Sequence, residues 1–424
     1  MSRYLPRIVD LELDELVTGL PAIALEGAKG VGKTATAGRR ARAVLRLDRP
    51  EERALLEADP GRLTRYPPPV LLDEWQRHPP AWDLVRRAVD DGAEAGRFLL
   101  TGSAVPIGTP VHSGAGRIVR LRLRPLSLAE RGLAAPSVSL RDLLAGDQPP
   151  LTGTHDVALP ALLESLLASG FPAIAAATPR SRRALLDGYL DQIVEREFAE
   201  LGHPVRRPLT LRAWLTAYAA ATATSASYTR ILNAATPGED DKPAKTTTIA
   251  YREVLEALYV LDPLPAWVPT RNALARLAQA PKHHLADPAL AARLLGVGRD
   301  ALLAGEEPAA TRLRHGDLTG RLFESLVTLS VRSYAQAAES RTAHFRTHGG
   351  EREVDLLVER DDGRVVAIEV KLTPTVSDDD VAHLHWLRGQ LGSDLLDAIV
   401  VTAGRDAYRR RDGIGVVPAV LLGP

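Results

Sequence analysis

The chain has 424 residues, of which 45% are hydrophobic and 25% are charged. A chain of this length is too long to fold around a single hydrophobic core, so we expect two to four domains. Lysine plus arginine and aspartate plus glutamate each number 53, which excludes a chain-wide field that would attract nucleic acid or an anionic membrane. Cysteine is absent, which excludes disulfides, thiolate zinc sites and thiol nucleophiles.

The start of the chain and its few lysines are also informative. Arg3 and Arg7 are followed by acidic residues, and the sequence has neither an apolar leader nor a long apolar run. We therefore expect a cytoplasmic protein that does not contact a membrane. Most of the basic charge is arginine, so each lysine carries more information than usual. The lysines are Lys29, Lys33, Lys242, Lys245, Lys282 and Lys371.

The first quarter of the chain alternates strands with helices. Residues 21–25 predict a buried strand that leads through a glycine-rich turn into a helix beginning near Lys33. Residues 70–72 and 97–101 predict two more buried strands, with a helix between them that ends at Gly92. This alternation indicates an α/β fold with a mostly parallel sheet covered on both faces.

Three further parts follow this α/β region, which we place at 1–125. Residues 126–205 are rich in leucine and alanine and predict a helical lid. Residues 206–275 predict helices at 209–223, 227–235 and 246–260, a spacing that suits a winged helix-turn-helix. Residues 276–424 predict a separate α/β module, with helices and strands in this order: helix 318–335, strands 342–346, 353–359 and 364–371, helix 378–391, and strand 396–402. Flexible joins are expected at 236–245 and 301–310.

The turn after the first strand matches G-x-x-x-x-G-K-[ST] in the strand-to-helix context that this motif requires. Its glycines let backbone N–H groups wrap phosphates, its lysine reaches the β- and γ-phosphates, and its threonine holds Mg²⁺. The alternative is a glycine-rich turn with an exposed lysine. The residues expected around the nucleotide are Gly27, Lys29, Gly30, Gly32, Lys33 and Thr34.

Acidic and hydroxyl residues at the ends of the next two strands would complete this site. Asp73 would enter the Mg²⁺ shell, and Glu74 would orient or deprotonate the attacking water. Ser103 is our first candidate for a group that senses the γ-phosphate, and Thr101 is the second, although Thr-Gly-Ser is also an ordinary turn. Arg117 would neutralise transition-state charge, in its own subunit or across a subunit boundary, unless it is simply a solvated surface arginine.

Together these motifs resemble the AAA+-type ATPases of bacteria and archaea that carry a C-terminal domain of unknown function. Further segments extend the resemblance over nearly the whole chain: Tyr4–Arg7, Leu123–Ser127, Ser169–Pro172, Tyr189–Arg196, Pro281–Asp287 and Gly320–Glu324. The resemblance implies ATP as the nucleotide, an ATPase core, a helical lid, a winged helix, and a C-terminal module with the PD-(D/E)xK nuclease fold. Lys29 departs from the arginine usual in this family, and 236–245 is a long polar insertion.

The C-terminal strands carry charged residues that suit such a module. A hairpin would bring Asp355 to Glu369 and Lys371, which face the same way because side chains alternate along a strand. The two carboxylates would hold a divalent metal at a phosphodiester while Lys371 activates water or stabilises charge. Glu324, on the preceding helix, would complete the metal shell. One alternative is an ordinary hairpin with solvated charged residues. Another is an inherited nuclease-like fold that now binds nucleic acid or a partner protein.

A basic loop before the third helix of the winged module would contact DNA phosphates. It comprises Lys242, Lys245 and threonines 246–248, followed by Tyr251 and Arg252. Asp240 and Asp241 dilute this charge, and winged modules also dock proteins, so both uses stay open.

The sequence therefore predicts an ATP-binding, Mg²⁺-dependent ATPase coupled to a nuclease-like module directed at DNA or RNA. A homo-oligomer would let Arg117 act between subunits. The alternative is a nucleotide-gated regulatory or chaperone-like switch for a protein partner, in which the C-terminal module is catalytically silent.

Overall fold

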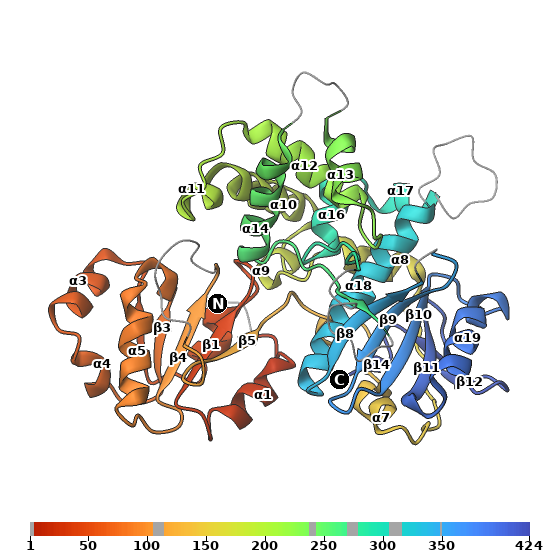
Figure 1. Cartoon of the computed structure of the whole chain (residues 1–424), viewed down its shortest axis with the longest axis horizontal. Helices are drawn as coiled ribbons and strands as arrows, with labels where there is room; N and C mark the ends of the chain where they lie inside the picture. Colours follow the sequence, from red (N-terminus) through yellow and green to blue (C-terminus); the bar gives the residue numbers. More distant parts are fainter. Residues whose placement is uncertain (1–3, 105–113, 237–242, 269–278, 305–315, 348–349) are drawn as a thin grey trace.

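A computed structural model describes residues 4–104, 114–236, 243–268, 279–304, 316–347 and 350–424. It contains two large sheets, one N-terminal and one C-terminal, which lie beneath a body of helices contributed by the middle of the chain (Figure 1). A third sheet has two short parallel strands, β6 (Val138–Ser139) and β14 (Leu422–Gly423). Across these ranges, no helix is both long and apolar enough to cross a bilayer.

The N-terminal sheet is parallel, with the strand order β2-β3-β4-β1-β5. The strands are β1 (Ala22–Glu26), β2 (Ala43–Arg46), β3 (Val70–Asp73), β4 (Phe98–Gly102) and β5 (Val119–Arg122). The helices around it are α1 (Val9–Leu16), α2 (Lys33–Gly38), α3 (Pro50–Ala58), α4 (Arg62–Arg65) and α5 (Pro80–Asp90). Alternate residues of β1 enter different cores, Ala22 and Ala24 on one face and Ile23 and Leu25 on the other. The predicted parallel sheet, buried on both faces, is confirmed.

The helical body combines the two parts that we expected to be a lid and a winged module. It consists of α8 (Leu159–Leu167), α9 (Pro172–Ala175), α10 (Pro179–Gln192), the π-helical turn η2 (Ile193–Glu197), α11 (Phe198–Glu200), α12 (Pro208–Ala220), α13 (Tyr228–Ala235), α14 (Lys245–Ala257), α16 (Pro288–Leu294) and α17 (Arg299–Ala304). Three of these helices, α12, α13 and α14, match the three predicted within 206–275. Helix α16 packs against both α10 and α12, so the boundary we placed at 205 lies inside one packed body.

The C-terminal sheet is mixed, with the order β12-β13-β11-β10-β9-β8-β7. Its strands are β7 (Ala266–Trp267), β8 (Arg341–Arg346), β9 (Glu353–Glu359), β10 (Val365–Lys371), β11 (Leu395–Thr402), β12 (Tyr408–Arg409) and β13 (Gly415–Pro418), with helices α18 (Gly316–Ala337) and α19 (Ala382–Leu391). Two segments outside 276–424 join it. β7 pairs with β8, and α7 (Leu140–Ala145) packs on β11 (Figure 1). The expected lid therefore begins with residues that belong to the C-terminal body.

A short antiparallel ribbon, formed by residues 259–264 and 282–286, links the sheets. Leu264 and Lys282 exchange two backbone hydrogen bonds of 2.9 Å, and the Asp262 N–H donates to the His284 carbonyl at 2.9 Å. The chain then continues directly into β7. The ribbon thus ends at the edge of the C-terminal sheet.

Asp262 of the ribbon lies among three arginines. Its carboxylate is 2.9 Å from Nε of Arg124 and 3.1 Å from Nη2 of Arg332, while Arg122 lies 3.7 Å away. Burial alone would raise the pKa of Asp262, but the three guanidinium groups hold it well below its ordinary value. Arg122 ends β5, Arg124 follows it, and Arg332 lies on α18, so Asp262 joins the N-terminal sheet to the C-terminal body.

Replacing Asp262 with alanine should lower the free energy of unfolding by about 3–5 kcal/mol, because buried guanidinium groups lose their common counter-charge. Urea unfolding followed by circular dichroism measures this change. Asp59→Ala, which breaks the exposed Arg65–Asp59 pair, is the control and should change stability by less than about 1 kcal/mol. Equal effects of the two substitutions would contradict the role of Asp262.

Candidate functional site

The glycine-rich turn leaves β1 and wraps tightly before α2 begins at Lys33. Gly27, Gly30 and Gly32 have φ angles of 156°, 83° and 106°, values that favour glycine. A Cβ at Gly27 would lie 2.1 Å from the carbonyl oxygen of Leu123, so no larger residue fits there. Arg7 fixes the far side of the turn, because its Nη1 donates to the Val31 carbonyl at 2.7 Å.

Lys33 is buried beneath this turn, with only 4% of its surface exposed. Its ammonium donates to the carbonyls of Gly27 and Ala28 at 2.8 and 2.9 Å. Burial lowers the pKa of Lys33 to about 8, against the opposing effect of Glu74 and Asp73. An anion bound in the turn would replace the carbonyls as the partner of this ammonium.

Thr34 and Asp73 meet as the sequence predicts for a Mg²⁺ shell. The Thr34 hydroxyl donates to Oδ1 of Asp73 at 2.7 Å, and the Thr101 hydroxyl donates to the same oxygen at 2.5 Å. These hydroxyl and carboxylate oxygens are hard ligands of the kind that Mg²⁺ prefers, together with substrate phosphates. The donor set therefore fits the ion.

Glu74 and Ser103 form a second contact beside the first. Glu74 has φ 55°, a conformation uncommon for a non-glycine residue, and its Oε2 accepts from Ser103 Oγ at 3.0 Å and from Gln76 Nε2 at 2.6 Å. The amide of Gln76 also donates to the Ser103 hydroxyl at 3.0 Å. Two side chains thus hold the Glu74 carboxylate next to the predicted Mg²⁺ ligands.

The helical body reaches the phosphate turn through Lys29. Its ammonium lies 2.8 Å from the carboxylate of Glu197 in η2. Lys29, Ser103 and Glu197 are among the residues that line a crevice of about 10 Å³, the space of about one water molecule. Lys29, which we expected to contact a phosphate, is thus paired with a carboxylate of the helical body.

Arg117 lies away from the phosphate turn, so it cannot contact a nucleotide bound in its own subunit. Val119 of β5 pairs with Ile23 of β1 in parallel, so Arg117 lies near the start of β1, whereas the phosphate turn follows its end. Its Nε donates to Oδ1 of Asp90 at 2.8 Å. A role for Arg117 would require a second copy of the chain.

The predicted C-terminal residues do come together, but around a lysine. The Lys282 ammonium lies 2.8 Å from Glu324, 3.0 Å from Asp355 and 2.9 Å from Glu353. Lys371 lies 3.0 Å from Glu369 on the same strand. Within the described ranges, no three histidine, cysteine or acidic residues are arranged to hold a metal ion. The structure therefore does not fit the metal expected at Glu324, Asp355 and Glu369.

The basic loop before α14 is only partly described, since Lys242, Asp240 and Asp241 lie outside the described residues. Lys245 and the first two threonines after it are exposed, whereas Thr248 and Tyr251 are buried. Tyr251 packs edge-on against Phe198. Tyr251 is therefore a core residue and does not face a phosphate backbone.

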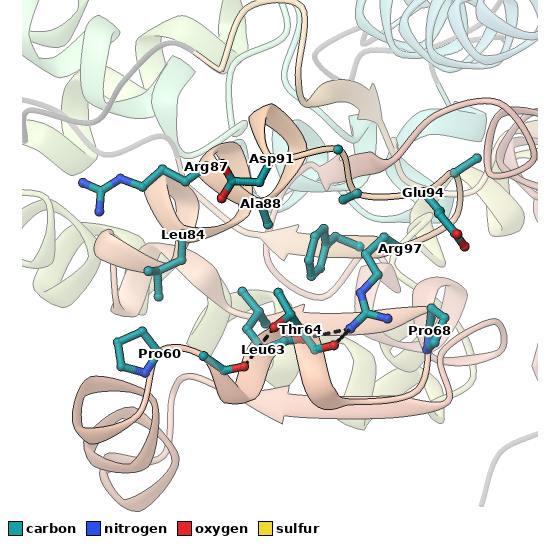
Figure 2. Close-up of a pocket in the computed structure, with 15 residues that line it drawn as sticks. Pro60, Leu63, Thr64, Pro68, Leu84, Arg87, Ala88, Asp91, Glu94 and Arg97 are labelled. Atoms are coloured by element: carbon teal, nitrogen blue, oxygen red, sulfur yellow. Dashed lines mark hydrogen bonds between the residues drawn. The ribbon is translucent and has the colours of Figure 1, made fainter.

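A cavity of about 490 Å³ lies on the N-terminal body away from the phosphate turn (Figure 2). Its walls come from the end of α5, the segment around α4 and the start of β4, at the opposite end of the parallel strands. Arg97 in its wall donates to the carbonyls of Leu63 and Thr64. None of the glycines of the phosphate turn lines this cavity, and neither does Asp73 or Glu74.

The fold and site together define a P-loop ATPase domain. A parallel sheet carries the glycine-rich turn on β1 and the acidic residues on β3, and residues 20–131 match the family described as an AAA domain. Residues 159–301 and 319–422 match two domains of unknown function, DUF8612 and DUF4143. The DUF8612 match crosses the boundaries that we expected at 205 and 275.

Similar proteins include two uncharacterized proteins, from Mycobacterium bovis and Mycobacterium tuberculosis. Each is 28% identical to this chain over 312 residues, which are 73% of this chain and 59% of the relative. The chain thus spans about three fifths of these curated relatives. The Walker-type ATPase PABY2304 of Pyrococcus abyssi is a similar solved structure, with 16% identity, a TM-score of 0.39, and coverage of 67% of this chain and 94% of that one.

Several residues near the sites had no predicted role. Tyr259 and Asp262 gave no sequence signal, because their partners are distant in the chain. Lys282 did give one, since it is one of only six lysines and lies in a segment that carries the family resemblance. Its partners Glu324 and Asp355 became apparent only from the fold.

The titration of Lys33 predicts a pH dependence of ATP binding. Its lowered pKa means that the free protein loses the Lys33 proton near pH 8, and bound phosphates favour the charged form. Affinity should be constant below pH 8 and then fall by at most about tenfold per unit. Titration calorimetry with Lys33→Arg as control measures this, because arginine stays protonated. An equal decline in both proteins would contradict the assignment.

Proposed function

We propose that this chain binds ATP with Mg²⁺ and hydrolyses it. The observation that carries the proposal is the bond of Thr34 and Thr101 to one oxygen of Asp73, directly beside the buried Lys33 and its glycine-rich turn. We propose ATP rather than GTP as the nucleotide because residues 20–131 match an AAA domain.

Each residue has a role in this proposal. Backbone N–H groups of the turn and the Lys33 ammonium bind the β- and γ-phosphates. Thr34 and Asp73 would hold Mg²⁺, which would supply positive charge to the phosphates. Glu74 accepts a proton from the attacking water, while Ser103 and Gln76 hold its carboxylate in place. Arg117 would contribute only from a neighbouring subunit.

Glu74→Gln should leave ATP binding intact and lower hydrolysis by about 10²–10⁴-fold, because the amide cannot accept the proton of water. Phosphate release and nucleotide affinity are measured in parallel. Glu57→Gln, an exposed carboxylate of the same domain, should behave as the wild type. Unchanged phosphate release in Glu74→Gln would contradict the role of Glu74.

A second function, a nucleotide-gated switch, is favoured by one contact between the ribbon and the nucleotide site. The Tyr259 hydroxyl donates to Oε2 of Glu26 at 2.7 Å, and Glu26 is the residue directly before Gly27. The ring of Tyr259 lies under the guanidinium of Arg122, 4.1 Å away. Tyr259 keeps this position at φ 59°, a conformation that costs an aromatic residue about 1–3 kcal/mol. Movement of the phosphate turn would reach the C-terminal body along this path.

Hydrogen exchange of the ribbon tests the switch. Binding of a slowly hydrolysed ATP analogue with Mg²⁺ should change amide exchange in residues 282–286, and Tyr259→Phe should reduce that change by removing the bond to Glu26. Tyr228→Phe, on α13, is the control. An equal change in Tyr259→Phe, or no change in the wild type, would contradict the coupling.

The nucleic-acid-directed nuclease remains a prediction that no described contact supports. This prediction includes the nuclease-like fold, the winged helix, and the binding of DNA or RNA. Cleavage of DNA and RNA with Mg²⁺ or Mn²⁺, compared with Lys371→Ala, tests it. A protein partner that binds only with ATP would instead support the switch.

A further inference from the structure

Lys282 is buried at the C-terminal body, with about 1% of its side chain exposed. An isolated buried ammonium is costly and needs matched counter-charges. Lys282 has three, because Glu324, Glu353 and Asp355 all lie within 3.0 Å of Nζ. These carboxylates come from α18 and β9, and the lysine reaches them from the ribbon.

The cluster has more negative than positive groups. Glu369 lies next to it on β10, where the neighbouring Val370 N–H donates to Asp355 at 2.9 Å. One Glu369 oxygen bonds Lys371, while Oε2 is buried without a partner in the described part of the chain. Four carboxylates thus face the ammonium groups of Lys282 and Lys371 and the guanidinium of Arg346, which lies 3.8 Å from Glu353. Burial, and then the charge of Asp355, raises the pKa of both Glu324 and Glu369 to about 8.

We infer that Lys282 is the resident cation of this carboxylate cluster and excludes a divalent metal ion from it. The ammonium bonds two of the three carboxylates expected to bind the metal, and the hydrogen bonds between Lys282 and Leu264 fix its backbone. A metal ion and the Lys282 ammonium cannot share this position. The inference does not depend on ATP hydrolysis.

Mn²⁺ binding to the full chain without nucleotide tests this inference by calorimetry. The wild type and Lys245→Met, an exposed lysine, should lack a Mn²⁺ site that depends on Asp355. Lys282→Met should gain about one equivalent of bound Mn²⁺, because the carboxylates lose their internal cation. The double variant Lys282→Met with Asp355→Asn should lose that equivalent. No gain in Lys282→Met, with folding shown by circular dichroism, would overturn the inference.

A second measurement covers the case in which Lys282→Met does not fold. The unfolding temperature of the wild type is compared with and without Mn²⁺, alongside Asp355→Asn. Because Lys282 fills the cluster, any Mn²⁺ effect should be the same in both proteins. A stabilisation of the wild type that Asp355→Asn abolishes would show a metal site open beside Lys282 and would overturn the inference.

Discussion

The arrangement of the two sheets depends on one buried carboxylate. Asp262 is shared by Arg122 and Arg124 at the edge of the N-terminal sheet and by Arg332 on α18. Removing one charge from such a cluster leaves the others without compensation, so the three elements are held together as a unit. One hydrophobic core also runs from Ile23 of β1 to Ile368 of β10. The ATPase domain and the C-terminal body are thus packed parts of one structure.

This packing gives the ribbon its significance. Its first strand touches Glu26 through Tyr259, and its second strand carries Lys282 into the C-terminal carboxylates. Coupling between distant sites needs an element that both sites bias, and the ribbon contacts both. The C-terminal cluster is closed by a lysine, so we interpret that body as the receiver of the nucleotide signal. Glu74, the catalytic residue that we propose in this chain, lies beside the phosphate turn at the end of β3.

The sequence predicted those parts of the fold that have strong local signals. β3 is a continuous apolar run, and α12, α13 and α14 have helical spacing. β2 and β5 were missed because they are edge strands with polar residues, and β7 because it has two residues. At the site, the contact of Thr34 with Asp73 followed from the motif. The position of Arg117 did not, because strand register decides at which end of the sheet it lies. The sequence did not reveal that Lys282 lies where we expected a metal ion, because only tertiary packing brings this lysine to Asp355.

A crystal structure with Mg²⁺ and a slowly hydrolysed ATP analogue tests the account most directly. We expect Lys33 to leave the carbonyls of Gly27 and Ala28 for the phosphates, with Mg²⁺ on Thr34 and Asp73. We also expect the bond between Tyr259 and Glu26, and with it the ribbon, to shift. A nucleotide bound at the turn with Tyr259, the ribbon and Lys282 all unmoved would contradict the claim that the nucleotide site is coupled to the C-terminal body.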